Sequence, residues 1–326
     1  MTQTRSISVA MCTYNGEKYL GEQLQSIANQ TRLPAELVIC DDCSTDASAM
    51  LIKDFKKSAP FDVKLVENPK NIGSAKKGVT RNFENASRLC SGDFIALCDQ
   101  DDIWFPEKLA RLATQMESDP RLGGVFSDAQ LVDQQSRPTG ARLSQANGFS
   151  RQDQARLEQG DALPILLAMT KVYGCTLMFD AGLRETILPV PPSWWFDAWL
   201  ACTIAVHSRL GYVADPLFSY RIHPSQQVSA SVSTYADRIR EWRQSAKQYW
   251  EQSQPQLMEL HAYLESQSDS RYQPQLNYVS GRMELLKMRA ALPNNHLSRL
   301  AKVLPEVNNY RRYFNGWKSV VKDITA

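Results

Sequence analysis

Short apolar runs alternate with longer amphipathic segments along the first hundred residues, and this alternation restricts the fold more than any other feature of the sequence. The apolar runs have the length of buried strands and lie at residues 7–12, 37–40, 63–66 and 94–98. The segments between them have a helical spacing of apolar residues and lie at about 19–30, 47–57 and 79–89. This order predicts a parallel, doubly wound sheet that binds its ligands at the carboxyl ends of the strands.

The rest of the chain predicts two parts of different character. We expect a helix at about 106–117, strands at 123–128 and 176–179, a flexible loop or lid at 135–160, and a helix that runs to about His207. From about Tyr235 the sequence is polar and helical. We therefore predict an α/β domain over residues 1–228, with a mostly parallel sheet flanked by helices, and a small α-helical region over 229–326.

Composition and charge exclude several classes of protein. The formal net charge of +2 is too small to indicate a nucleic-acid partner. The first residues lack the apolar core of a signal peptide, and no run approaches the roughly 18 apolar residues of a membrane span. Seven cysteines lie mostly in apolar runs, which favours reduced thiols in a cytoplasmic protein. The pair Cys40 and Cys43 has no partner pair, so we do not expect a zinc or redox site there.

An acidic segment, Asp99-Gln100-Asp101-Asp102, directly follows the apolar run at 94–98. Carboxylates gathered at a strand end repel one another unless a cation or hydrogen-bond donors compensate them. Alternate residues of an extended segment point the same way, so Asp99 and Asp101 can converge on Mg²⁺ or Mn²⁺, which also binds the phosphates of nucleotides. The alternative is a solvated acidic turn in which Asp102 caps the following helix.

Two further strand ends carry polar residues that would lie at the same edge of the sheet. Thr13, Tyr14 and Asn15 close the first strand, and Asp41 and Asp42 close the second. A carboxylate can accept a hydrogen bond from a nucleobase, and a tyrosine ring offers it a flat face. Singly, Asp42 and Ser44 can also be helix caps, and Tyr14 can be an aromatic residue of a turn. Together they predict a nucleotide site.

A second candidate centre is Asp197, which lies in the tryptophan-rich segment at 193–200. Neighbouring aromatic side chains partly desolvate a carboxylate and raise its basicity, and they also offer faces on which a sugar can stack. We therefore predict Asp197 as a general base and Trp104, Trp195 and Trp199 as residues that contact a sugar. The alternative for Asp197 is a charge in the first turn of a helix, where the helix dipole favours it.

Four motifs together resemble those of the family 2 glycosyltransferases, which have the GT-A fold. They occur in the family's order, at residues 12–16, 41–46, 71–73 and 99–104. The resemblance covers roughly residues 5–225 and implies an inverting transferase that takes a sugar from a nucleotide-diphosphate sugar. It divides the α/β domain into a donor-binding half over about 1–128 and an acceptor half over about 129–228.

The resemblance also implies roles for individual residues. The donor nucleotide would be bound by Thr13, Tyr14, Asn15, Asp41, Asp42, Arg81, Asp99 and Gln100. Mg²⁺ or Mn²⁺ would be held by Asp101, Asp99 and His223. Arg221, in a Tyr-Arg-x-His segment, would contact the acceptor sugar or balance the diphosphate charge. Lys76 and Lys77 compete with Arg81 for the basic position near the donor.

Asp197 would be the catalytic base, although Phe196 precedes it where related enzymes carry an acidic residue or a histidine. The motifs at residues 12–16 and 98–104 most resemble those of bacterial rhamnosyltransferases of surface polysaccharide assembly. This implies dTDP-L-rhamnose as donor and a lipid-linked glycan as acceptor. A UDP-hexose or UDP-HexNAc transferase and a non-catalytic nucleotide-binding scaffold remain alternatives. A dinucleotide-dependent oxidoreductase is disfavoured, because residues 13–17 are not a glycine-rich turn.

The C-terminal segment at 297–321 interleaves basic residues with aromatic and aliphatic ones. This pattern suits an anionic membrane surface, where a lipid-linked acceptor would be found. The alternative is a helix that packs on the catalytic domain with a solvated basic face. We expect a cytoplasmic protein that binds peripherally to the inner face of the cell membrane.

Overall fold

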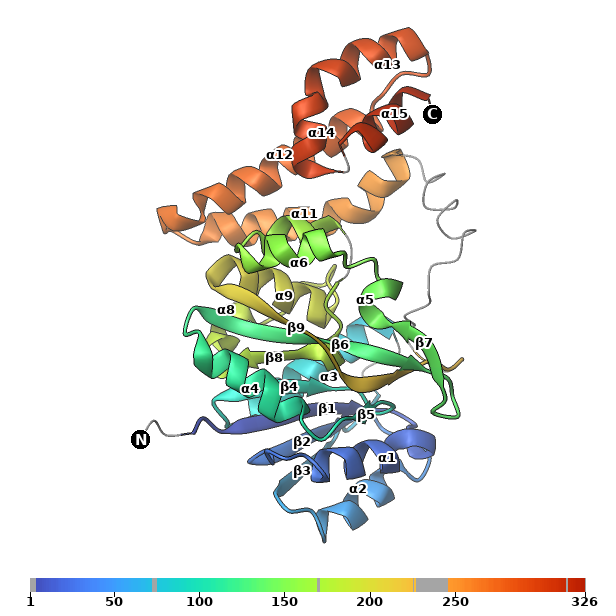
Figure 1. The fold of residues 1–326 in the computed structure, drawn as a ribbon, viewed down its shortest axis with the longest axis vertical. Helices are drawn as coiled ribbons and strands as arrows, with labels where there is room; N and C mark the ends of the chain where they lie inside the picture. The colour runs from blue at the N-terminus through green and yellow to red at the C-terminus, as the bar shows by residue number, and fades with distance from the viewer. Residues whose placement is uncertain are drawn as a thin grey trace. The chain divides into compact units, whose positions relative to one another are not determined.

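The computed structural model describes residues 4–71, 75–168, 171–224, 226, 246–314 and 316–325. The chain divides into two compact units, Met1–Val232 and Ser233–Ala326 (Figure 1). Within the described residues, no helix is both long enough and apolar enough to cross a membrane.

The first unit is built on a nine-stranded sheet, counted over the described residues, with the order β3-β2-β1-β4-β8-β6-β9-β5 and with β7 paired to β6. Its strands are β1 (Ile7–Thr13), β2 (Glu36–Asp41), β3 (Asp62–Glu67), β4 (Phe94–Cys98), β5 (Ile103–Trp104), β6 (Leu122–Val132), β7 (Pro138–Arg142), β8 (Leu177–Asp180) and β9 (Arg209–Arg221). The first four strands are parallel, as predicted. The others pair antiparallel, except that β6 and β9 are parallel.

Helices cover both faces of this sheet (Figure 1). The longer ones are α1 (Glu17–Ala28), α2 (Ser48–Lys56), α3 (Ala75–Leu89), α4 (Lys108–Ser118) and α9 (Phe196–His207). Apolar residues of α1, α2 and α4 share one hydrophobic cluster with the strands, as their helical spacing predicts. Helix α3 packs against α9 through stacked rings of Phe83 and Phe196. Shorter helices are α7 (Ala162–Ala168), α8 (Arg184–Ile187), η1 (Gly174–Thr176) and η2 (Ala181–Leu183).

The prediction of a flexible loop or lid at residues 135–160 is wrong. The segment contains β7, α5 (Leu143–Ala146) and α6 (Arg151–Glu158). Each short element is anchored by few apolar residues, among them the buried Leu143 and Leu157. Ser150 caps α6 by accepting a hydrogen bond from the Asp153 backbone N–H. Elements this short contain too few apolar residues to show a helical or strand periodicity. The polar composition of the segment therefore wrongly indicated a loop.

The second unit is α-helical in its described residues. It contains α11 (Ala246–Ser266), η3 (Ser270–Tyr272), α12 (Gln273–Ala290), α13 (His296–Val303), η4 (Leu304–Glu306), α14 (Val307–Tyr313) and α15 (Trp317–Thr325). A buried ion pair joins Arg289 Nε to Asp323 Oδ2 at 2.5 Å, and the Tyr310 hydroxyl donates to the same oxygen. The helix start expected at about Tyr235 lies outside the described residues.

A buried carboxylate at the start of β2 ties neighbouring strands together. Glu36 is only 3% exposed and accepts hydrogen bonds from Ser8 Oγ at 2.7 Å, Ser91 N at 2.5 Å and Lys64 Nζ at 2.5 Å. Burial alone would raise the pKa of Glu36. The hydrogen bonds outweigh burial and lower the pKa from 4.5 to about 2.

We expect Glu36→Gln to lower the free energy of unfolding of the first unit by about 2 kcal/mol at pH 7, because it removes charge-assisted hydrogen bonds. Since the pKa of Glu36 is depressed in the folded state, its contribution is complete above about pH 4.5 and is lost as the pH falls toward 2. Urea unfolding at pH 7 and pH 3 measures both effects. The control is Glu67→Gln, which breaks an exposed ion pair with Lys53 and should cost less than about 0.5 kcal/mol. Equal losses in the two variants would contradict the expectation.

Candidate functional site

The first and last sequence motifs meet directly at one edge of the sheet. Because β1 and β4 are parallel neighbours, the residues that follow them lie side by side. Tyr14 N donates to Gln100 Oε1 at 2.9 Å, and Gln100 Nε2 donates to Tyr14 O at 3.1 Å. A Cβ at position 16 would lie 2.4 Å from Gln100 Oε1, so a larger residue there would require the Gln100 amide to move.

The Asp41 carboxylate joins the ends of β1 and β2. It is buried and accepts hydrogen bonds from Thr13 Oγ1 at 2.7 Å, Ser44 N at 2.8 Å and Ser44 Oγ at 2.6 Å. The neighbouring Asp42 is also buried, and its Oδ1 accepts from Asn68 Nδ2 at 3.1 Å. The residue that caps α2 is Ala47, so the interpretation of Asp42 and Ser44 as helix caps is wrong.

The loops after β1 and β2 each contain a residue in left-handed backbone conformation, and Asn15 joins the two loops. The left-handed residues are Asn15, with φ 47°, and Cys43, with φ 60°. Asn15 Oδ1 accepts from Thr45 N at 2.8 Å, and Asn15 N donates to Ser44 Oγ at 2.9 Å. Beside this junction Tyr14 leaves 42% of its surface exposed, enough for a planar group to stack on it.

The third motif is only partly within the described residues, because Ile72 and Gly73 lie outside them. Its first residue, Asn71, donates from Nδ2 to Asp42 O at 2.9 Å. The motif is therefore connected to the end of β2 through at least one of its residues.

Three carboxylates crowd the end of β4. Asp99 and Asp101 are half-buried, and Asp102 is fully buried. Asp102 Oδ1 accepts from Arg221 N at 3.1 Å, whereas its buried Oδ2 has no hydrogen-bond partner among the described residues. The cap of α4 is Glu107, so the alternative that Asp102 caps this helix is wrong. Burial and the charges of Asp101 and Asp99 raise the pKa of Asp102 well above its ordinary value.

A buried cation lies beneath these carboxylates, and the sequence analysis missed it. Lys108 is 1% exposed, and its Nζ donates to Cys175 O at 2.5 Å and lies 4.1 Å from the centre of the Trp104 ring. Burial lowers the pKa of Lys108 to about 8, against the opposing effect of the nearby acidic groups. The sequence did contain one indication that Lys108 is buried, because it lies four residues before Leu112 and therefore on the apolar face of α4.

The half-buried carboxylates of Asp99 and Asp101 are oxygen ligands of the kind that a hard divalent cation prefers. Burial, followed by the charge of Asp101, raises the pKa of Asp99 to about 7, so a cation here would relieve a real repulsion. Asp101 Oδ2 lies 2.9 Å from His223 Nε2. Ligand atoms of Asp99, Asp102 and Cys175 also lie within 4.8 Å of one another. However, burial raises the pKa of the Cys175 thiol well above its ordinary value, and a protonated thiol is a poor ligand for Mg²⁺ or Mn²⁺. Asp101 and His223 are more suitable ligands than Cys175, and Asp99 is not grouped with these two within that distance among the described residues.

Asp197 lies in the first turn of α9 and is half-buried. Its Oδ2 accepts from Gly174 N at 3.0 Å, and its Oδ1 accepts from Ala198 N at 2.7 Å. Burial raises the pKa of Asp197 to about 6, although these hydrogen bonds oppose the shift. The charge of Asp197 contributes to the raised pKa of Asp99, so the two carboxylates interact electrostatically. Such a carboxylate is ionised at neutral pH and is more basic than a solvated one.

Three residues predicted to contact the acceptor sugar do not fit that role, because they are buried. Trp104 packs on Lys108, and Trp199 Nε1 donates to Ile187 O at 2.7 Å. Arg221 is 1% exposed and donates to neighbouring protein groups. Core and surface aromatic residues are indistinguishable in the sequence.

Two further predicted residues keep some exposure. Trp195 is half-buried and precedes α9, and Arg81 is exposed on α3. Of the two competing lysines, Lys76 donates to Ser193 O, while Lys77 is exposed. The structure therefore leaves Arg81 and Lys77 as the more accessible basic groups on this helix.

Comparison with known proteins identifies relatives of this chain. The family model described as Glycosyl transferase family 2 matches residues 8–169. An uncharacterized glycosyltransferase of Nostoc sp. is 26% identical over 71% of this chain and 69% of its own length. The dTDP-rhamnosyl transferase RfbG of Shigella flexneri is 35% identical over 30% of this chain and 34% of its own length. The chain spans 63% of the length of a Mycobacterium tuberculosis relative that is 25% identical.

Two solved structures resemble the chain over almost its whole length. One is Staphylococcus aureus TarS 1-349 in complex with UDP-GlcNAc, with a TM-score of 0.59 and 16% identity over 98% of this chain and 81% of that one. The other is the mannosyltransferase PcManGT of Pyrobaculum calidifontis in complex with GDP-Man and Mn²⁺, with a TM-score of 0.54 and 16% identity over 99% and 87%. These likenesses confirm the expected GT-A-like α/β fold with a C-terminal helical segment.

We expect Asp101→Asn to lower the pKa of Asp99 from its value of about 7, because the charge of Asp101 is the largest cause of the shift after burial. Carboxyl ¹³C NMR titration of the metal-free protein measures this pKa. The control is Asp119→Asn, which breaks a surface ion pair with Arg121 and should leave Asp99 unchanged. An unchanged Asp99 pKa in Asp101→Asn would refute the arrangement.

Proposed function

We propose that this chain, whose residues 8–169 form a glycosyltransferase domain of family 2, transfers a sugar from a nucleotide-diphosphate sugar to a glycan hydroxyl with inversion of configuration. The main support is the meeting of three features at one sheet edge. These are the exposed ring of Tyr14, the pair of Asp101 and His223, and the half-buried Asp197. They correspond to the three requirements of the reaction, which are donor recognition, charge compensation and a base.

Donor recognition is assigned to the ends of β1 and β2, within a donor half of about residues 1–128. Tyr14 would stack on the base, and Asp42 with Asn15 would bind the nucleoside. Thr13, Asp41 and Gln100 would shape this pocket, since their polar groups already bond one another or the loops. Asp99 would lie on the ribose side, and Arg81 would face the donor from α3. Residues 129–228 would form the acceptor half.

The proposed donor is dTDP-L-rhamnose. The support is the Shigella relative, a dTDP-rhamnosyl transferase that matches 30% of this chain. A UDP-hexose or UDP-HexNAc donor is the second candidate, because the TarS structure of the same fold contains UDP-GlcNAc. With a rhamnosyl donor, the product would belong to a bacterial surface polysaccharide.

Mg²⁺ or Mn²⁺ is the proposed cofactor, held by Asp101, Asp99 and His223. The Pyrobaculum mannosyltransferase of similar fold contains Mn²⁺ together with its GDP-mannose. A cation bound here would neutralise charge on the departing nucleoside diphosphate.

Asp197 is the proposed catalytic base. Two backbone N–H groups fix its carboxylate, and burial raises its pKa to about 6. It would take the proton of the acceptor hydroxyl, whose oxygen then attacks the anomeric carbon. The bond from that carbon to the phosphate oxygen breaks on the opposite face, so the configuration inverts.

Purified protein is mixed with Mn²⁺ and each of a panel of nucleotide-sugars, and the nucleoside diphosphate released is measured, with water accepting the sugar in this assay. We expect turnover with dTDP-L-rhamnose and a loss of Mn²⁺ stimulation in Asp101→Ala. Asp197→Asn should lower the rate by about 10²–10⁴-fold and leave donor binding intact, because the base acts only in the chemical step. In the unaltered protein the rate should rise with pH through about 6, as Asp197 loses its proton.

The control for these variants is Asp119→Asn, which should be fully active. Metal-stimulated turnover by Asp101→Ala would refute the metal assignment. Binding of nucleotide-sugars without turnover in any condition would favour a non-catalytic scaffold.

The acceptor is proposed to be lipid-linked and to be met at the cytoplasmic face of the cell membrane through α13 and α15. Of the residues predicted to contact the membrane, Val303, Tyr310 and Tyr313 are buried in the second unit, so they do not fit that role. The exposed apolar side chains are Leu297, Leu300, Leu304, Trp317 and Val321. Exposed basic side chains accompany them, namely Lys302, Arg311, Arg312 and Lys318. Apolar anchors with basic neighbours are complementary to an anionic lipid surface.

We expect the full chain to sediment with vesicles of phosphatidylcholine and phosphatidylglycerol, and less with phosphatidylcholine alone. The double variant Leu297→Ser and Trp317→Ser should reduce the bound fraction several-fold, because it removes two exposed apolar anchors. Met258→Ser removes an exposed apolar side chain of α11 and is the control. If the bound fraction is the same with and without phosphatidylglycerol and is unchanged in the double variant, this surface does not bind the membrane.

A further inference from the structure

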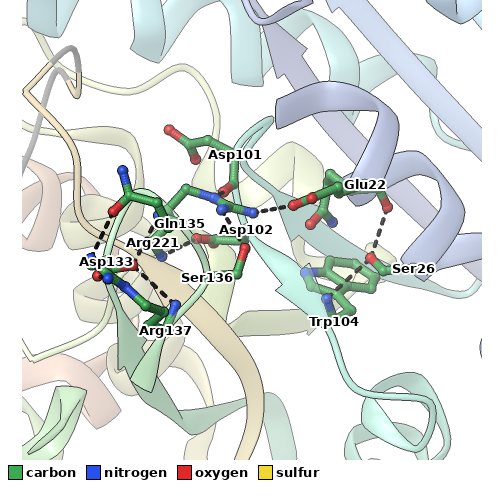
Figure 2. A network of polar contacts seen from close by, with 11 residues as sticks. Glu22, Ser26, Asp101, Asp102, Trp104, Asp133, Gln135, Ser136, Arg137 and Arg221 are labelled. Atoms are coloured by element: carbon green, nitrogen blue, oxygen red, sulfur yellow. Dashed lines mark hydrogen bonds and ion pairs between the residues drawn. The ribbon is translucent and has the colours of Figure 1, made fainter. Parts of the chain in front are cut away.

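The guanidinium of Arg221 joins three segments that are far apart in the sequence. Arg221 is the last residue of β9 and is 1% exposed. Its Nε donates to Asp101 O at 2.8 Å, its Nη1 to Ser136 Oγ at 2.7 Å and its Nη2 to Glu22 Oε2 at 2.5 Å. Figure 2 shows these groups converging on Arg221 from α1, from the acidic segment and from the turn after β6.

The same short stretch of chain, residues 221–223, also contacts two of the three carboxylates of the acidic segment. The backbone N–H of Arg221 donates to Asp102 Oδ1 at 3.1 Å, and His223 Nε2 lies 2.9 Å from Asp101 Oδ2. The side chains of Arg221 and His223 both pack on the ring of Tyr19. Its centre lies 4.4 Å from the guanidinium carbon of Arg221 and 4.8 Å from the ring centre of His223. Arg221 thus fixes Asp101 at its backbone carbonyl, and the Asp101 carboxylate lies against His223, the other proposed ligand of the cation.

We propose that Arg221, together with Glu22 and Ser136, positions Asp101 for the divalent cation. The three residues are called the Arg221 clamp below. The inference rests on the metal role proposed for Asp101. A buried guanidinium costs desolvation that an apolar side chain of similar size would avoid, so its stabilising value is small. Its value is geometric, because second-shell hydrogen bonds orient metal ligands and set metal affinity.

Ser136 offers a way to test the clamp without weakening the fold. It has a φ of 62°, a left-handed conformation that strains any residue with a Cβ. Ser136→Gly removes the oxygen that accepts from Arg221 and at the same time relaxes the backbone. Glu22→Gln removes the charge at the other end of the clamp, and the Glu22 side chain is 57% exposed, so little packing is lost.

The control is Arg137→Gln in the same turn. Arg137 pairs with Asp133 at 2.7 Å and is exposed, so this variant disturbs the turn but leaves every bond of Arg221 in place. All variants are compared in the full chain, with Mn²⁺ alone as the probe. Electron paramagnetic resonance of free Mn²⁺ gives the dissociation constant, and thermal unfolding reports the fold.

Ser136→Gly should weaken Mn²⁺ binding about tenfold, and Glu22→Gln should weaken it less, with unfolding temperatures close to that of the unaltered protein. Arg137→Gln should bind Mn²⁺ normally. If Ser136→Gly and Glu22→Gln both bind Mn²⁺ as tightly as the unaltered chain, the clamp is wrong and the metal site stands. The same holds if Arg137→Gln loses as much affinity as they do. If the unaltered chain binds Mn²⁺ no better than Asp101→Ala, the proposed metal site fails, and the inference fails with it.

Discussion

Electrostatic repulsion among the carboxylates that follow β4 is the constraint on which the rest of the structure depends. Asp99, Asp101 and Asp102 lie within four residues, the first two half-buried and the third fully buried, so other parts of the chain must compensate their charges. The charge of the buried Lys108 favours their ionised forms, and Arg221 at the C-terminal end of β9 donates hydrogen bonds to Asp102 and to the backbone of Asp101. The mixed second half of the sheet is what brings β9 to this position.

The first half of the fold was predictable because its signals are local. Strands β1 to β4 and the helices between them each span a window in which the apolar period is clear. The second half depends on pairings such as β4 with β8 and β6 with β9, and these are set by packing across the chain. Strand β5 has only two residues, and the elements within 135–160 bury few apolar side chains each. No sequence window of useful length could reveal them.

The acidic residues of the site were found in the sequence because strand ends are recognisable, and Arg221 was named for a different role, but Glu22 and Ser136 were not found. Glu22, Ser136 and Arg221 are scattered along the chain and meet only in the folded state. For Lys108, the sequence showed only a charged residue on the apolar face of a helix, and it did not show that the side chain is buried near the carboxylates. Trp104 is buried in the core and is not accessible to a sugar, and the sequence does not show which tryptophans are buried.

The reciprocal hydrogen bonds between Tyr14 and Gln100 have a consequence for engineering the protein. These bonds join the loop after β1 to the acidic segment, and the Gln100 amide packs closely against Gly16. If the loop after β1 is exchanged without the residue at position 100, these two hydrogen bonds are lost. The two segments therefore have to be exchanged together if the geometry at this edge of the sheet is to be kept.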